Sequence, residues 1–272
     1  MKKSSSDPIG VFDSGLGGLT VLKELIRALP NERIIYLGDT ARVPYGNKSH
    51  ETVIRYAFEN TRFLLRRGIK LLIIACNTAS AYSMDAVKDA FDVYSLGVIQ
   101  PGARAAVRNT RSGKVAIIGT SGTILSKAYP RAIHDLNRDI VTYEKACPLF
   151  VPLVEEGWMD HEVTEMVARS YLGPMIGKEI DTLILGCTHY PLLKVVISRV
   201  MGPDVMLVDS AEETAKEAKT LLKGIDLLAP DHSEGGYQVF VTDLPQQFSN
   251  VASLFLGMDQ VPVERVIVDE IV

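Results

Sequence analysis

Short aliphatic runs alternate with amphipathic stretches along most of the chain. The runs "IGVF", "IIYLG", "LLIIA", "VAIIG" and "TLILG" are separated by patterns with helical spacing, such as "LTVLKELIRAL". Strands that are apolar at consecutive positions are buried on both faces, and such strands form parallel sheets when helices connect them. The pattern therefore predicts an α/β fold with parallel β-strands.

Two parts of the chain resemble each other in the same order. "GVFDSGLGG" is similar to "AIIGTSGT", and "IIACNTAS" is similar to "LILGCTHY" a little over a hundred residues later. This indicates an internal duplication. We therefore expect two similar parallel-sheet α/β domains related by pseudo-two-fold symmetry, with the active site in the cleft between them.

Pro101 and Gly102 interrupt the pattern near the expected domain boundary. After "VMLVD", Ser210 is expected to cap a helix that has acidic residues in its first turn. The later segments "YQVFVT" and "VERVIV" need a sheet to join, so the C-terminal segment should return to the first domain. The predicted domains are residues 1–98 with 211–272, and residues 99–210. Other helices are expected at about 49–67, after Pro101, from about Ile124, and twice between residues 148 and 177.

Cys76 and Cys187 each follow an aliphatic run and precede a threonine within two residues. Ligands of open α/β sheets bind beyond the carboxyl ends of the strands, where both thiols are expected. Two acid/base groups on opposite sides of a carbon suit the removal of a proton from one face and its return to the other. A free thiol has a pKa of about 8.5, so modest tuning allows both protonation states near neutral pH. The pair predicts a racemase or epimerase.

Polar residues surround the two thiols in the sequence. Asp13 follows the first strand, His189 stands two residues after Cys187, and "LVEEG" contains Glu155 and Glu156, of which Glu156 is expected to be solvated. A carboxylate or imidazole near a thiol can accept or relay its proton. Side chains and backbone N–H groups at helix starts can hold a carboxylate, and the residues expected to do so are Ser14, Asn77, Thr78, Thr120 and Thr188.

Overall charge and cysteine count limit the possible partners and compartments. The net charge is −4 and the sequence pI is about 5.8, which argues against a nucleic acid or an anionic membrane as a partner. No apolar run approaches the length of a membrane span. Three cysteines without CxxC spacing indicate reduced thiols, so a cytoplasmic location is expected. Cys147 lacks polar followers and is interpreted as structural.

The motifs "DSGLGG", "DTARVPYG", "IACNTA", "GVIQPGARAA", "CPLFVPLVEEG" and "LGCTHYP" resemble those of bacterial glutamate racemases, in the same order and over essentially the whole chain. The resemblance implies cofactor-independent and metal-independent interconversion of L- and D-glutamate, which supplies D-glutamate for peptidoglycan, and a homodimer. It implies that Cys76 and Cys187 are the catalytic acid/bases, with Asp13, Glu155 and His189 assisting. The substrate-binding residues it implies are Asp13, Ser14, Pro44, Tyr45, Gly46, Asn77, Thr78, Thr120, Thr123, Thr188 and His189.

Several other interpretations remain open from the residues alone. An aspartate racemase would share the two-thiol logic, and a non-catalytic amino-acid-binding protein could use the same fold. A zinc site from Cys76, Cys187 and His189 lacks the short ligand pairs of structural sites. "SGLGGLT" is a weak dinucleotide motif because Thr20 replaces its third glycine. A redox dithiol would require the two thiols to lie close enough to bond.

Overall fold

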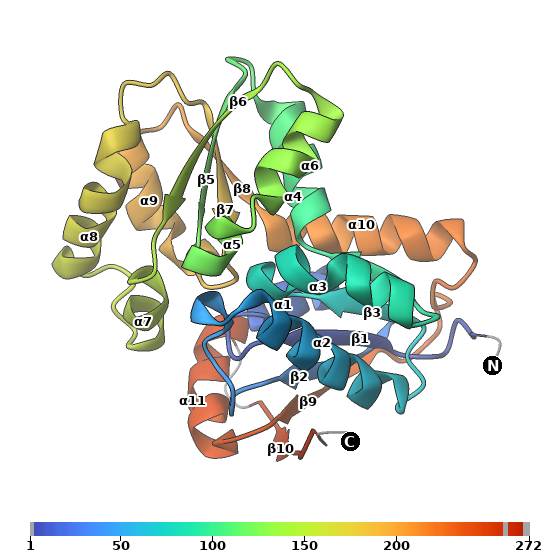
Figure 1. The fold of residues 1–272 in the computed structure, drawn as a ribbon. Helices are drawn as coiled ribbons and strands as arrows, with labels where there is room; N and C mark the ends of the chain where they lie inside the picture. The colour runs from blue at the N-terminus through green and yellow to red at the C-terminus, as the bar shows by residue number, and fades with distance from the viewer. Residues whose placement is uncertain (1–2, 258–260, 269–272) are drawn as a thin grey trace.

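The computed structural model describes residues 3–257 and 261–268, and its described strands form two sheets in which all pairings are parallel. Figure 1 shows the two sheets in separate halves of the molecule. The first sheet has the spatial order β10 (Val263–Arg265), β9 (Gly236–Val241), β2 (Arg33–Gly38), β1 (Ile9–Asp13), β3 (Leu71–Ile74) and β4 (Tyr94–Gly97). The second has the order β6 (Val141–Ala146), β5 (Lys114–Gly119), β7 (Thr182–Gly186) and β8 (Met206–Asp209).

The two sheets share one topology. In each, four strands that follow one another in the chain lie in the spatial order second, first, third, fourth: β2-β1-β3-β4 and β6-β5-β7-β8. This agrees with the duplication expected from the sequence, and the prediction of two similar parallel-sheet domains is confirmed. Cys76 and Cys187 follow β3 and β7, which are the third strands of their sheets. The repeat therefore brings both thiols to equivalent ends of equivalent strands.

Helices cover both faces of the first sheet because alternate strand residues point to opposite sides. Ile9 and Val11 of β1 pack in one cluster with α1 (Leu19–Ala28), α10 (Ser210–Gly224) and α11 (Pro245–Leu256). Phe12 of β1 packs in another with α2 (His50–Leu65) and α3 (Asn77–Ala90). A short 3-10 helix, η1 (Tyr45–Asn47), precedes α2.

The second sheet is also covered on both faces. Val115 and Ile117 of β5 pack in one cluster with α4 (Ile99–Asn109) and α6 (Ala128–Leu136), while Ala116 and Ile118 belong to the cluster of the opposite face. The remaining helical elements of this half are α5 (Ser121–Leu125), α7 (Phe150–Glu155), α8 (Glu162–Leu172), η2 (Gly173–Met175), η3 (Tyr190–Leu193) and α9 (Lys194–Met201).

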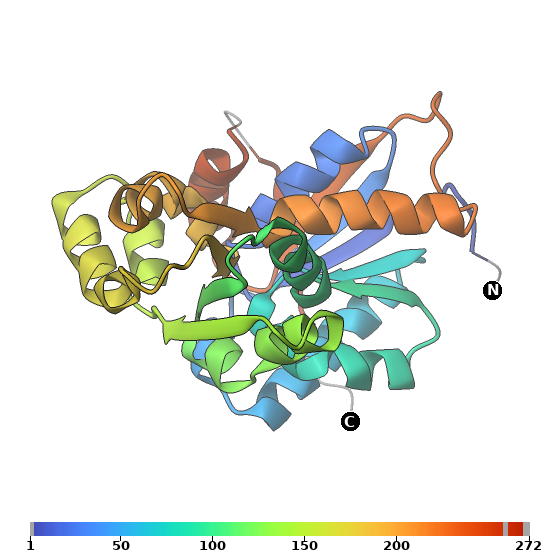
Figure 2. The same ribbon diagram turned by 90° about the horizontal axis from the view of Figure 1, so that it is seen from above.

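Helix α10 joins the two halves, and Figure 2 shows it as the long orange helix crossing the molecule. It contacts α1 of the first half and α4 of the second, where Arg104 pairs with Glu217 and Arg108 pairs with Glu213. One hydrophobic cluster contains residues from both halves. Strands β9 and β10 lie beside β2, so the C-terminal segment joins the first sheet. The exact domain bounds stay a prediction, and residues 1–2, 258–260 and 269–272 within them lie outside the described residues.

Three local predictions from the sequence were inaccurate. Asp209, not Ser210, caps α10, because its side chain accepts a hydrogen bond from the Ala211 N–H at 2.9 Å. Helix α4 begins at Ile99, before Pro101, since proline is tolerated in the first turn. The helix expected from about Ile124 is two helices, separated where Lys127 has a positive φ of 56°.

Among the described residues, no helix is both long and apolar enough to cross a membrane.

Candidate active site

Cys76 lies between the end of β3 and the start of α3. It is the N-cap of α3, and its Sγ accepts a hydrogen bond from the Ala79 N–H at 3.5 Å. The side chain is only 6% exposed. Burial raises the pKa of Cys76 to about 12, the charge of Asp13 adds to the rise, and the Ala79 N–H and the Ser14 hydroxyl oppose it. The Cys76 thiol is therefore held neutral unless something in the site takes its proton.

Cys187 directly follows β7 and has a different neighbour. Its Sγ lies 3.8 Å from Nδ1 of His189, and Nε2 of His189 lies 2.9 Å from Oε1 of Glu155 at the end of α7. Burial alone would lower the pKa of His189, but its hydrogen bonds to Cys187 and Glu155 raise that pKa to about 10. Thiol, imidazole and carboxylate thus form a chain along which a proton can move.

Asp13 connects the two halves of the site. It ends β1, is fully buried, and accepts a hydrogen bond from the Gly15 N–H at 2.9 Å. The Thr188 hydroxyl, from the other domain, lies 3.5 Å from its second oxygen. Burial raises the pKa of Asp13, although the positive charge of His189 and nearby backbone N–H groups act in the opposite direction. The charge of Asp13 also raises the pKa of Cys76, so Asp13 interacts with residues near both thiols.

The turn after β1 packs directly on the turn that carries Cys187. A Cβ at Gly17 would lie 2.2 Å from the Thr188 hydroxyl and 2.5 Å from Nδ1 of His189, so only glycine fits there. The Thr20 hydroxyl lies 2.9 Å from the Gly17 carbonyl and 3.0 Å from the Thr188 carbonyl, so its single proton is shared between these two acceptors. Neither Gly17 nor Thr20 is a site residue predicted from the sequence. The glycine-rich "SGLGG" carried the signal, but it indicates equally a close approach to a ligand or to another backbone.

A cluster of hydroxyl groups lies next to Cys76. Thr78 Oγ1 is 2.8 Å from Thr120 Oγ1 and 3.2 Å from Thr123 Oγ1, and the latter two lie 3.0 Å apart. Asn77 is buried and accepts a hydrogen bond from the Tyr129 hydroxyl at 2.8 Å, while its Nδ2 has no partner among the described residues. A buried donor without a partner is costly. Asn77 is therefore a candidate donor to a bound ligand.

Tyr45 lies close to this cluster, but its side chain points elsewhere. The hydroxyl donates to Asp39 and accepts from Nδ2 of Asn60 at 3.1 Å, and the residue is 1% exposed. A Cβ at Gly46 would lie 2.7 Å from Cβ of Thr120, so the η1 backbone touches the second domain. Of the predicted "PYG" ligands, the tyrosine hydroxyl is thus already bonded to Asp39 and Asn60.

Two further residues considered from the sequence are Glu156 and Cys147, and Cys147 lies in the same hydrophobic cluster as Cys187. Glu156 is exposed, and Cys147 is fully buried in the hydrophobic cluster, where burial raises its pKa to about 12. Among residues 3–257 and 261–268, no three His, Cys, Asp or Glu side chains are grouped as metal ligands would be.

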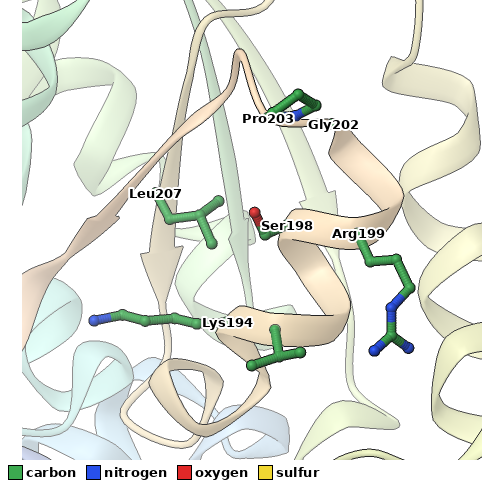
Figure 3. A pocket seen from close by; sticks show the side chains of 7 residues that line it. Lys194, Ser198, Arg199, Gly202, Pro203 and Leu207 are labelled. Atoms are coloured by element: carbon green, nitrogen blue, oxygen red, sulfur yellow. The ribbon is translucent and has the colours of Figure 1, made fainter.

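A surface pocket of about 620 Å³ lies beside α9 and does not include either predicted acid/base (Figure 3). Its two cations are already paired, since Lys194 contacts Asp209 and Glu212, and Arg199 contacts Asp160 and Glu165. This pocket is therefore separate from the predicted acid/bases, Cys76 and Cys187.

Residues 9–218 match the Asp/Glu/Hydantoin racemase family. The chain belongs to this family. It is 55% identical over 249 residues to a glutamate racemase of Geobacter metallireducens, with 92% of each chain covered. The structure is similar to that of glutamate racemase isoform RacE1 from Bacillus anthracis, with a TM-score of 0.93, 42% identity, and 97% and 98% of the two chains covered.

A glutamate racemase from Francisella tularensis, solved in complex with D-glutamate, is also similar. Its TM-score is 0.91, its identity is 41%, and the match covers 98% of this chain and all of that one. Membership of the Asp/Glu/Hydantoin racemase family confirms the resemblance seen in the sequence, the fold class and the isomerase class. The roles of the individual residues in this chain stay predictions.

Proposed function

We propose that this chain is a glutamate racemase that interconverts L- and D-glutamate without a cofactor, with Cys76 and Cys187 as its two acid/bases. The observation that carries the proposal is the placement of two buried thiols after equivalent strands of a duplicated domain. Relatives named glutamate racemase, at up to 55% identity in the comparisons above, support glutamate as the substrate.

The proposed reaction moves one proton on each side of the α-carbon. One thiolate takes the α-proton, so that the C–H bond breaks and an S–H bond forms. The opposite thiol then gives its proton to the other face of the carbanion, so that its S–H bond breaks and a new C–H bond forms. The reverse reaction exchanges the two roles. Since each thiol is no more than 6% exposed, charge would develop away from bulk water.

The two thiols would be activated differently. His189, held by Glu155, is in contact with Cys187 and can take the thiol proton to give a thiolate beside an imidazolium. Cys76 has the N-terminus of α3, the Ser14 hydroxyl and the buried carboxyl of Asp13 as neighbours. We assign Asp13 the exchange of a proton with Cys76, because its buried carboxyl acts on that thiol and burial brings its pKa closer to that of the thiol.

The α-carboxylate would bind at the hydroxyl cluster and at Asn77. Helices α3 and α5 both begin there, so their first N–H groups and the positive ends of their dipoles favour an anion. A preorganised donor at a developing negative charge is worth about 3 kcal/mol. Several such donors would lower the barrier to forming the carbanion, which is the difficult step.

The proposed product, D-glutamate, fits a role in peptidoglycan synthesis in the cytoplasm, where thiols stay reduced. The resemblance of the chain to bacterial glutamate racemases is also the reason for proposing a homodimer.

The decisive test follows the α-proton of L-glutamate by NMR in D₂O, together with the circular dichroism of the solution, with a chelator present and no cofactor added. We expect both signals to disappear. If the α-proton stays while calorimetry shows glutamate binding, the chain is an amino-acid-binding protein. If L-aspartate loses both signals and L-glutamate does not, the chain is an aspartate racemase.

A further inference from the structure

A buried network of polar side chains holds the loop between β2 and α2. At its centre is Asp39, which is fully buried and accepts hydrogen bonds from Tyr45 and from the Arg42 Nε at 2.8 Å. Arg42 pairs with Glu59 of α2 and also donates to the side-chain oxygen of Asn60 at 3.3 Å. Each polar group at the centre of the network therefore has a partner.

The C-terminal segment closes the network from the other side. The Thr242 hydroxyl, just after β9, donates to Asp39 at 3.1 Å and accepts from the Ala41 N–H at 2.8 Å. Thr40 and Asp243 exchange two hydrogen bonds between the same segments. The loop is thus fixed by α2 and by residues two hundred positions away, as well as by its own turn.

Stability alone does not account for such a network. Asp39 and Glu59 place two buried negative charges beside the partly exposed Arg42, and removing ions from water costs several kcal/mol each. Apolar residues of the same size would fill this space at least as well. Buried polar groups of this kind fix a geometry, because each bond has a required direction.

The geometry that the network fixes is that of the η1 backbone at the domain interface. Tyr45 is anchored by Asp39 and Asn60, and the next residue, Gly46, is pressed against Thr120. Thr120 in turn bonds Thr78, two residues from Cys76. The first N–H groups of a 3-10 turn have no partner inside the turn, so those at the start of η1 can donate to a ligand.

We propose that Asp39, Asn60 and the Tyr45 hydroxyl form a positioning network that holds the backbone of Tyr45 and Gly46 for contact with the substrate. Tyr45 would then act through its main chain, and its hydroxyl would act only on the loop. The inference rests on the proposed racemase function, of which it identifies a positioning device. A backbone donor would bind the ground state and the transition state alike, so its loss should raise KM and leave kcat nearly unchanged.

The test compares Tyr45→Phe and Asp39→Asn with the wild type in both reaction directions. We expect KM to rise about tenfold for L- and for D-glutamate, with kcat changed less than about threefold. The Kd of D-glutamate from titration calorimetry should rise by the same factor. If KM and Kd stay at the wild-type values in Tyr45→Phe, the positioning role is wrong.

Lys70→Met is the matched control, because Lys70 is fully buried in an ion pair with Glu32, at 2.6 Å, away from both thiols. We expect it to lower Tm at least as much as Tyr45→Phe and to leave KM unchanged. An equal rise of KM in the control would overturn the proposal, since a loss of stability alone would then explain the rise of KM. A wild type that neither binds nor converts glutamate would instead overturn the proposed function, and the positioning role with it.

Discussion

The surroundings of Cys76 and Cys187 differ although their backbones correspond. Both thiols follow the third strand of a four-strand repeat, and both are less than a tenth exposed. Cys187 has an imidazole 3.8 Å away, itself bonded to Glu155. Cys76 instead caps a helix, and burial together with Asp13 raises its pKa to about 12. The duplication has thus kept the positions of the thiols and not their chemistry.

In the proposed two-thiol mechanism, an asymmetric site would support a symmetric reaction. L- and D-glutamate have equal free energies, so kcat/KM must be equal in the two directions whatever the site looks like. Each thiol needs only to act once as base and once as acid per pair of opposite turnovers. The neighbours can therefore differ, provided that neither thiol is fixed in one protonation state.

The largest expected effect comes from removing one thiol at a time. Cys76→Ala and Cys187→Ala should each lower racemisation about 10⁴-fold or more in both directions, because one of the two proton transfers is lost. Each variant keeps one base, so each should exchange the α-proton of only one enantiomer with D₂O, and the two variants should select opposite enantiomers. NMR with each enantiomer measures this.

Cys147→Ala is the control for these variants, since that thiol is buried in the hydrophobic cluster and has no assigned role. It should keep turnover within a few-fold of the wild type. Exchange of both enantiomers at equal rates by either active-site variant would show that one residue serves both faces, and the two-base scheme would be wrong.

The second prediction tests whether His189 acts on Cys187 and not on Cys76. His189→Gln should lower kcat/KM about 10²-fold, equally in both directions, because Cys187 loses the group that accepts its proton. With α-deuterated substrates, the primary isotope effect should stay large for the enantiomer deprotonated by Cys187. It should shrink for the other enantiomer, whose deprotonation by Cys76 is then no longer rate-limiting.

Glu155→Gln tests the same chain one step further away. It should change the isotope effects in the same sense and by less, because it alters only the partner of His189. If His189→Gln changes the isotope effects of both enantiomers alike, His189 serves both thiols, and the contrast between the two sides does not hold.

The sequence predicted the fold and the thiol pair because these depend on local patterns. Consecutive apolar residues indicate buried strands, and the echo of "ACNTAS" in "GCTHYP" placed the cysteines at equivalent strand ends. Contacts between the domains could not be predicted in this way. Two examples are the packing of Gly17 against Thr188 and the hydrogen bond from Tyr129 to Asn77. In each, the two residues are far apart in the chain. The orientation of Tyr45 depends likewise on Asp39 and Asn60, whose side chains no local pattern brings together.

The third prediction concerns Thr20, which ties the first domain to the Cys187 turn. Thr20→Val keeps the shape and removes the hydroxyl proton that the Gly17 and Thr188 carbonyls share. A net hydrogen bond contributes about 1 kcal/mol, so kcat/KM should fall about fivefold. Thr20→Ser should restore most of the activity. If Thr20→Val is as active as the wild type, this contact does not position the Cys187 side.

The smallest effect is on the free energy of unfolding. His189 and Cys76 should each change it over a different pH range. The pKa of His189 is raised to about 10 in the folded chain from about 6.5 when unfolded. Between these values the folded state holds more protons than the unfolded one, so the free energy of unfolding falls as pH rises from about 6.5 to about 10. The raised pKa of Cys76 has the same sign but acts only between about 9 and about 12.

Urea unfolding at several pH values can therefore separate the two contributions. His189→Gln should flatten the loss of stability between pH 7 and pH 8.5 by about 2 kcal/mol, whereas Cys76→Ala should follow the wild type there and diverge only above about pH 9. His232→Gln, at an exposed position, serves as the control and should not change the profile. If Cys76→Ala flattens the curve below pH 8.5 as much as His189→Gln does, the two thiol environments are coupled through Asp13 and act as one titrating unit.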